Sequence, residues 1–409
     1  MSNRTRLIFL AAGLTVSVVG SRAGAGNDEI VIGMSAAFSG SSRGLGIEAY
    51  RGSIAYFEAV NRSGGIHGRK IRIIAYDDGY DPIRAIENTV RLIEKDNALL
   101  LYGYFGTPTV TRVLPLLKEY EDHPAYLFFP FTGAEPHRRA PYEKYVFNLR
   151  ASYARETAGL VDNFVRIGRK RIGVFYQSDA YGRSGWAGVR QALAKHGLHI
   201  AEEATYRRGT AFSASMREQV AILRSVNPDA VISVGTYAAS AAFIRDARDE
   251  NWNVPIANLS FVGSESLLSL LSELGEATGK DYTHDLINSQ VIPSYHNREL
   301  PAVREYRDSM DTRHPSGPMG LTPEDYHPLK YSFVGFEAFL DAKLLTEILR
   351  RAGPDISGSR LAKAAESLND FDLGIDVPVS FGPGRHQAMD TIYYTSVKDG
   401  RFLPLEGWR

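Results

Sequence analysis

The feature that most constrains this chain is a regular alternation of short apolar runs with longer segments whose apolar residues recur at helical spacing. It begins with an apolar run at 29–34, a loop rich in serine and glycine at 39–46, and an amphipathic run at 49–60. Apolar runs of about four to eight residues are typical of buried strands, whereas apolar residues three and four positions apart indicate helices. Repeated strand–helix units predict parallel sheets covered by helices on both faces.

The alternation continues to residue 261 and forms two blocks, at 28–148 and 149–290. The predicted strands lie at 29–34, 70–76, 98–102, 125–129, 171–176, 200–206, 230–234 and 256–261. The predicted helices lie at 49–60, 82–94, 109–120, 155–166, 186–195, 215–225, 238–249 and 331–351. A chain of 409 residues is long enough for two or three domains. We therefore predict an α/β fold with two doubly wound parallel-sheet lobes.

Residues 1–25 have the pattern of a secretion signal. Arg4 and Arg6 precede an uncharged apolar run at 7–20, and the small residues at 23–25 fit a cleavage site. The run is shorter than the roughly 20 apolar residues that span a bilayer, and no later stretch is long enough. We therefore expect a cleaved signal peptide; a retained membrane anchor is the alternative.

Charge and cysteine content exclude several classes of protein. The chain has 47 basic and 47 acidic residues, and removal of 1–25 takes away three arginines and no acid, which leaves 44 against 47. Such a balance gives no support to nucleic-acid binding, which usually needs a basic excess. The chain has no cysteine. That excludes a cysteine nucleophile, disulfides, zinc–thiolate sites and iron–sulfur clusters.

No motif for catalysis, metal binding or cofactor binding is apparent. The 10 histidines include no His-Glu-x-x-His, the glycine-rich stretches at 40–46 and 182–185 lack the Walker lysine and the dinucleotide fingerprint, and no Gly-x-Ser-x-Gly occurs. Asp77 and Asp78 resemble an acid pair, but adjacent strand residues point to opposite faces, so we interpret them as caps of the following loop. We expect no catalytic residue, no metal and no cofactor.

In sheets of this class, ligands bind in the crevice beyond the carboxyl ends of the strands. The loops there lie at 38–46, 104–109, 130–134, 177–185 and 235–237 and contain many small, hydroxyl and aromatic residues. Thr107 lies at the start of a predicted helix, where its hydroxyl and the backbone N–H groups suit an anionic group; a simple helix cap is the alternative. Aromatic residues placed for stacking on a ligand are Tyr104, Phe105, Phe131, Tyr181, Tyr237 and Tyr326.

Several segments resemble the leucine/isoleucine/valine-binding family of periplasmic receptors. The matching pieces are Phe-Ser-Gly at 38–40, Asn-Arg-Ser-Gly-Gly-Ile-His-Gly at 61–68, the strand 71–78 with its Tyr-Asp-Asp end, 103–109, 130–134, 146–153 and Asp-Ala-Tyr-Gly at 179–182. The resemblance covers nearly all of the chain after residue 25. It implies the type I periplasmic-binding fold, in which two lobes joined by a three-segment hinge close on a small ligand.

The resemblance also implies where the lobes divide. The three hinge segments fall at 150–152, 291–293 and 379–381. Lobe one then contains 26–148 and 293–378, and lobe two contains 149–292 and 379–409. Hinge closure suits such a receptor because a ligand bound by both lobes is shielded from water.

Ligand-binding positions of the family are carried over one residue at a time. The hydroxyl that holds the ligand's carboxylate matches Thr107, and backbone contributions match Phe131 and Gly133. The aromatic residue of lobe two matches Tyr181. The remaining matches are Thr236 or Tyr237 for a tyrosine near the ligand's amino group, Val262 for a carboxylate, and Tyr326 for an aromatic residue after the second hinge segment.

Two positions depart from the family pattern. Leu45 stands where an aromatic residue is expected, and Val262 stands where amino-acid receptors place the carboxylate that neutralises the ligand's ammonium. A buried ammonium without a counter-charge is costly. A shift of a few residues would make Glu265 the missing acid. The ligand is therefore an amino acid, or a carboxylate or amide that lacks the ammonium.

The resemblance implies a monomeric periplasmic receptor that delivers its ligand to the permease of an ABC importer. The alternative is a ligand sensor of the same fold that docks on a membrane signalling protein. An enzyme is a third reading, for which the chain offers no catalytic constellation. The sequence does not separate the first two readings, because both bind a ligand and only the partner differs.

Overall fold

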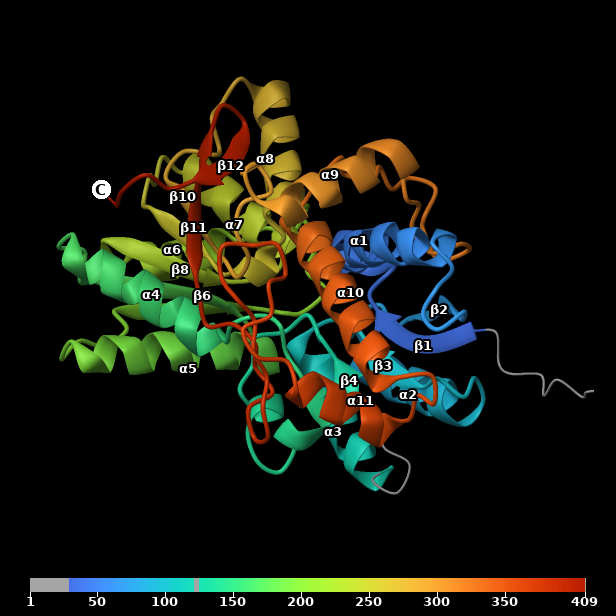
Figure 1. Cartoon of the computed structure of the whole chain (residues 1–409). Coiled ribbons are helices and arrows are strands. Elements are labelled where there is room, and N and C mark those ends of the chain that lie inside the picture. The colour runs from blue at the N-terminus through green and yellow to red at the C-terminus, as the bar shows by residue number, and fades with distance from the viewer. Residues whose placement is uncertain (1–28, 121–124, 409) are drawn as a thin grey trace, which may run out of the picture.

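The computed structural model describes residues 29–120 and 125–408, so the predicted signal peptide at 1–25 lies outside the described residues. Two sheets lie side by side (Figure 1), with orders β2-β1-β3-β4-β5 and β12-β11-β10-β9-β8-β6-β7. The strands of the first sheet are β1 (Glu29–Ala36), β2 (Lys70–Asp77), β3 (Leu100–Tyr102), β4 (Leu127–Phe128) and β5 (Val146–Phe147). Those of the second are β6 (Ile172–Gln177), β7 (Glu202–Tyr206), β8 (Ala230–Val234), β9 (Ile256–Asn258), β10 (Leu286–Gln290), β11 (Tyr393–Lys398) and β12 (Arg401–Pro404).

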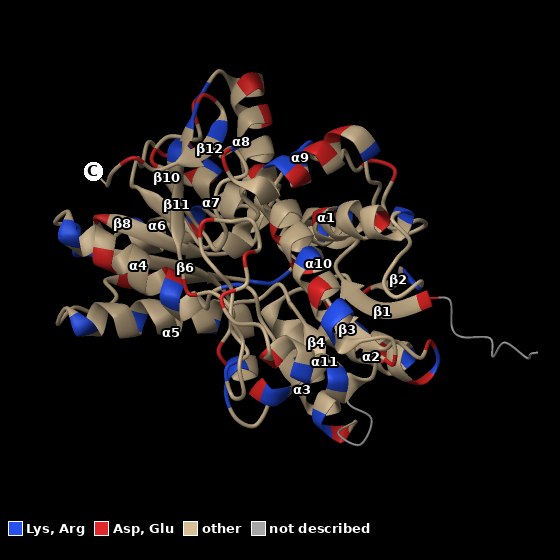
Figure 2. Cartoon of the chain, in the orientation of Figure 1, with Lys and Arg blue, Asp and Glu red and all other residues tan. Residues whose placement is uncertain are grey.

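Helices cover both sheets. Those packed around the first sheet are α1 (Arg43–Arg62), α2 (Pro82–Glu94), α3 (Thr107–Glu119), α9 (Pro301–Arg313), α10 (Phe333–Ala352) and α11 (Gly358–Glu366). Those around the second are α4 (Tyr153–Arg166), α5 (Ala180–Lys195), α6 (Arg217–Arg224), α7 (Tyr237–Asp249) and α8 (Ser264–Thr278). Charges of both signs are interspersed over these helices (Figure 2).

The predicted parallel pairing is confirmed for the first sheet and for most of the second. Ile30 pairs with Ile71, and Val231 pairs with Ile256, in parallel register. All five residues of β8 are buried, as expected for a strand covered on both faces. The sequence did not predict β11 and β12, which pair antiparallel at one edge. Only Thr395 of β11 and Phe402 of β12 are buried, so these strands lack the continuous apolar run by which the other strands are recognised.

Two local predictions were wrong, and a close backbone contact explains the first. The glycine-rich stretch 43–46 is the first turn of α1 rather than a loop. A Cβ on Gly46 would lie 2.1 Å from the carbonyl oxygen of Ala37, so glycine allows this close approach. The strand predicted at 256–261 ends at Asn258, and a short 3-10 helix, Ser260–Val262, carries Phe261 out of the sheet.

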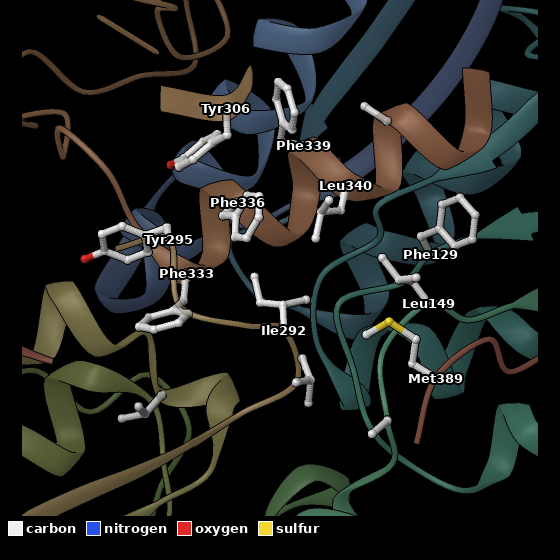
Figure 3. Close-up of a cluster of buried hydrophobic side chains, with 14 of the residues drawn as sticks. Phe129, Leu149, Ile292, Tyr295, Tyr306, Phe333, Phe336, Phe339, Leu340 and Met389 are labelled. Atoms are coloured by element: carbon white, nitrogen blue, oxygen red, sulfur yellow. The ribbon is translucent and has the colours of Figure 1, made fainter. Parts of the chain in front are cut away.

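The chain passes between the two sheets three times, and the passages converge on α10. Figure 3 shows Leu149, Ile292 and Met389, one from each passage, gathered beside the face of α10 that carries Phe336 and Leu340. All five belong to one buried cluster. All three passages therefore pack in one apolar cluster beside α10.

The third passage differs in place from the expected segment 379–381. Phe381 packs on Phe147 of the first sheet, with ring centroids 5.5 Å apart. The chain leaves that sheet later, where the backbone N–H of Ala388 donates to Asn148 and that of Met389 donates to Leu149. The lobe boundaries 26–148 with 293–378, and 149–292 with 379–409, stay a prediction.

Asp77 and Asp78 cap loops, as the sequence analysis interprets them. Asp77 accepts hydrogen bonds from the backbone N–H groups of Phe38, Ser39 and Gly79. It thereby ties the loop after β1 to the end of β2. Asp78 accepts from the Ser35 hydroxyl at 2.8 Å and from its own loop, the Tyr80 N–H, at 2.8 Å.

The buried carboxyl of Asp78 gives a prediction about pH. Burial raises its pKa from 3.8 to about 7, so the folded protein keeps a proton that the unfolded chain releases. This raised pKa makes the free energy of unfolding fall as pH rises from about 4 to 7, by about 1.4 kcal/mol per pH unit for one such group. We expect Asp78→Asn to flatten this fall in urea unfolding at a series of pH values. An unchanged slope would contradict the assignment.

Candidate functional site

Aromatic rings close the crevice between the carboxyl ends of the two sheets. Phe105 follows β3 and Phe131 follows β4, while Phe261 comes from the second sheet. The centroid of Phe261 lies 4.9 Å from that of Phe105 and 5.4 Å from that of Phe131. All three side chains are buried. The two halves of the molecule therefore meet through stacked rings at the place where a ligand is expected.

Three tyrosines complete this aromatic cluster. Tyr80 lies 5.2 Å from Phe105, Tyr181 lies 4.6 Å from Phe261, and Tyr153 lies 5.2 Å from Tyr181, all between ring centroids. The three tyrosines are buried. We call Tyr80, Phe105, Phe131, Tyr153, Tyr181 and Phe261 the aromatic cluster.

Local sequence sets these rings in place. The N-cap Asp179 accepts hydrogen bonds from the backbone N–H groups of Tyr181 and Gly182, which fixes the first turn of α5. Gly106 has φ of +93°, and a Cβ there would lie 2.1 Å from the Tyr80 ring. Only glycine both adopts this positive φ readily and leaves room for the Tyr80 ring.

Hydroxyl groups border the aromatic cluster on the side of the first sheet. The Thr107 and Thr132 hydroxyl oxygens lie 2.7 Å apart, and both residues are buried. The N-cap of α3 is Gly106, so Thr107 is not the cap. Thr109, by contrast, donates its hydroxyl back to carbonyl groups of its own turn. Thr107 therefore turns toward the 130–134 loop, and its role in ligand binding stays a prediction.

The predicted residues Phe131 and Gly133 also lie at this point. The carbonyl of Gly133 accepts from the Tyr153 N–H at 2.7 Å. A Cβ on Gly133 would lie 2.6 Å from the Tyr153 ring. The phenolic oxygen of Tyr153 is buried and has no hydrogen-bond partner among the described residues.

Three other predicted site residues make their contacts outside the aromatic cluster. Tyr104 belongs to a different core and bonds Thr89 on α2. Thr236 donates its backbone N–H to the Tyr206 hydroxyl at 3.0 Å. Val262 is fully buried beside Phe261.

Tyr237 and Tyr326 lie at the rim of the crevice. The Tyr237 hydroxyl accepts from the backbone N–H of Gly44 at 3.2 Å and so joins α7 to α1 across the two halves. The Tyr326 hydroxyl donates to Glu48 at 2.8 Å. Both tyrosines pack against the same buried apolar cluster as Phe261.

Glu265 does not supply the missing counter-charge. Its carboxylate accepts from the Phe333 N–H of α10 at 3.2 Å and lies beside Tyr295. Burial raises its pKa to about 7. The shift of register considered from the sequence therefore places no acid at the aromatic cluster.

Arg150 is the functional candidate that sequence reasoning missed. It was expected only as part of the first hinge segment. Its side chain is fully buried, and its guanidinium lies over the Phe131 ring, 4.4 Å from the centroid. It donates to the Ser260 hydroxyl across the crevice, and its Nη1 has no partner in the part of the chain that the structure describes.

Two buried acids balance this cation. Arg150 forms an ion pair with Glu337 of α10 at 3.4 Å. Glu156 accepts hydrogen bonds from the hydroxyls of Ser260 and Ser289 and from the Ser260 N–H. Burial raises the pKa of Glu337 to about 7. Burial opposes the charge of Arg150, but Glu337 and the other nearby acids outweigh it and leave its pKa raised.

Comparison with known proteins agrees with this architecture. A sequence model of the periplasmic binding protein family matches residues 29–401. A solved structure of a possible leucine/isoleucine/valine-binding protein from Rhodopirellula baltica is 32% identical, with a TM-score of 0.81, and the match covers 93% of this chain and 97% of that one. The Leu/Ile/Val-binding protein homolog 7 of Brucella melitensis is 24% identical over 375 residues, which is 88% of this chain and 86% of that protein.

A shorter match involves an amino acid binding protein of Pseudomonas aeruginosa, which is 24% identical over 224 residues. That match spans 54% of this chain and 58% of that protein. Within residues 29–120 and 125–408, no group of three potential metal-ligating side chains occurs. None of the helices in those ranges is long and apolar enough to cross a bilayer.

The Arg150 network predicts a stability defect that depends on pH. Arg150→Met keeps the length of the side chain but leaves Glu337 and Glu156 without their cation. Breaking a buried ion pair costs about 3–5 kcal/mol. We expect that loss in urea unfolding at pH 8 and a smaller one at pH 6, because protonated Glu337, whose pKa is raised to about 7, needs no partner.

Arg155→Met is the matched control, because Arg155 is exposed and its ion pair with Asp390 is long, at 3.7 Å. It should change the free energy of unfolding little. Equal losses in the two variants would show that the buried pair has no special role.

Proposed function

The chain belongs to the periplasmic binding protein family, and from that premise we propose that it is an extracytoplasmic receptor for a small carboxylate with an apolar or aromatic body and no ammonium group. The observation that carries this proposal is the chemistry of the crevice. Aromatic rings suit the apolar body. Arg150 and the Thr107 hydroxyl suit a carboxylate.

The acids of the described chain argue against an ammonium group in the ligand. At the position where family receptors hold their carboxylate, this chain has Val262, and Glu265 is turned toward α10. Glu156, which shares the Ser260 hydroxyl with Arg150, is occupied by three donors from Ser260 and Ser289. An ammonium buried there would lack a free counter-charge, which is costly.

The relatives' names refer to leucine, isoleucine, valine and amino acids in general, so an amino acid is the competing ligand. The carboxylate end is common to both ligand classes. The difference lies at the α-carbon, where an amino acid carries the ammonium and the corresponding acid or 2-oxo acid does not.

The lobes close over the ligand by bending at the three passages. Lobe one consists of 26–148 and 293–378, and lobe two of 149–292 and 379–409, with the last boundary moved toward residues 386–390. Leu149, Ile292 and Met389, one from each passage, gather beside α10. This common contact supports bending of all three passages at one place. A bound ligand takes the place of contacts between Phe261 and the rings of the other half.

The receptor acts as a monomer in the periplasm after cleavage of residues 1–25 and passes its ligand to an ABC permease. It performs no catalysis and needs no cofactor. The mixed charge of the helices supports a small-molecule ligand over nucleic acid (Figure 2).

A ligand panel tests the proposed ligand class. Leucine and phenylalanine are compared with 4-methyl-2-oxopentanoate, phenylpyruvate and the matching amides in thermal unfolding and titration calorimetry. A ligand that binds the native state at 100 times its dissociation constant adds about 2.7 kcal/mol to the free energy of unfolding. We expect the acids without an ammonium to stabilise the protein more than the amino acids. Preference for leucine would contradict the proposal.

Thr107→Ala tests the polar end of the site. We expect binding of the preferred acid to weaken by about 1–3 kcal/mol in calorimetry, because a charge-assisted hydrogen bond is lost. Thr111→Ala, one turn further along α3, is the matched control and should bind as the parent does. Equal affinity of all three proteins would remove Thr107 from the site.

A further inference from the structure

A cavity lies between the two halves, and none of the residues of the aromatic cluster line it. It has a volume of about 550 Å³ and is bordered by α8 and the β11–β12 turn of one half and by α9 and residues 329–331 of the other. Tyr295 and His296 of the second passage also line it. A ligand in this cavity can therefore contact both halves only while the halves lie as close together as they do in this structure.

Three polar side-chain atoms in the walls are buried and unpartnered within the described residues: Oε1 of Glu265, Nε2 of His296 and Nε of Arg307. They come from α8, the second passage and α9. Unsatisfied buried polar atoms are costly, because they have lost their hydrogen bonds to water. Their concentration around one cavity indicates that a polar guest belongs there.

The side chains that line the cavity favour an anionic ligand. Arg307, Lys330 and Arg401 border the cavity, and Arg307 lies over the Tyr331 ring, 4.0 Å from the centroid. Asp311 of α9 is engaged by Lys330 and by the Tyr331 hydroxyl. Glu265 is the acid inside the walls, and two of the three unpartnered atoms are nitrogens.

The protonation states of the lining residues favour a ligand that is rich in hydrogen-bond acceptors. Burial raises the pKa of Glu265 to about 7, so its carboxyl carries a proton over much of the pH range below neutrality. Burial, with Arg307 and Arg401, lowers the pKa of His296. A protonated carboxyl and the Nε–H of Arg307 both donate hydrogen bonds.

We propose that this cavity binds a small oxyanion, a free phosphate or a carboxylate, held by Arg307, Arg401 and His296. It is a second site, because the ring of Phe261 and the Thr107 hydroxyl take no part in it. The anion joins β12 of one half to α9 of the other and thereby stabilises the closed form of the protein. A metabolite bearing either group satisfies the same donors.

The test uses inorganic phosphate and citrate as separate probes on the whole protein, by titration calorimetry and thermal unfolding, with chloride at matched ionic strength as the reference. Arg307→Gln and Arg401→Gln remove wall cations. Arg304→Gln is the matched control, because Arg304 lies on the same helix, is exposed and donates to the carbonyls of Arg298 and Glu299.

We expect saturable binding of one probe to the parent protein and to Arg304→Gln, and about tenfold weaker binding to each wall variant, the loss of one charged hydrogen bond. Arg401 is exposed, so Arg401→Gln stays folded even if Arg307→Gln does not. Absence of saturable binding to the parent, or equal binding by all four proteins, would overturn the proposal. Thr107→Ala should bind the anion as the parent does. A test of the oxyanion site is therefore independent of whether the proposed ligand site at the aromatic cluster is correct.

Discussion

The guanidinium of Arg150 lies where the first passage, helix α10 and the second sheet meet, and it has no access to water. It contacts Glu337 from one side, Ser260 from another and the face of Phe131 from a third. A buried cation is tolerated only with good partners, so each of these three segments is held where the charge requires it. The arrangement of both halves, and of the crevice between them, depends on this single group.

The aromatic cluster adds the second constraint. Phe261 leaves its sheet after β9 and packs on Phe105 and Phe131 of the opposite half. Each ring buries a large apolar area, so parting the halves exposes it to water. In the function we propose, a ligand with an apolar body recovers that loss by occupying the same space, and its carboxylate binds Arg150 and Thr107 at the border. Binding and closure are thus two consequences of one set of contacts.

The sequence predicted the elements whose signal is local. The runs that became β8 and α2 carry continuous or helical apolar patterns, and both were predicted with the observed bounds. The glycine-rich start of α1 and the bend before Phe261 depend on close contacts with distant backbone, which no local pattern records. Of the predicted site, Thr107, Phe131, Gly133 and Tyr181 lie together, whereas Tyr104 packs elsewhere. Arg150 was missed because its polar partners, Ser260 and Glu337, lie more than 100 residues away along the chain.

Phe261 of one half packs on Phe105 and Phe131 of the other, over the proposed ligand site, and we expect it to hold the two halves together. Because the chain has no cysteine, a cysteine pair at the exposed positions Lys118 of α3 and Lys195 of α5 takes spin labels at those two sites alone. Double electron–electron resonance then gives the distance between the halves. The account predicts a narrow distribution for the labelled parent and a longer, broader one after Phe261→Ala. The same narrow distribution in both proteins would contradict it.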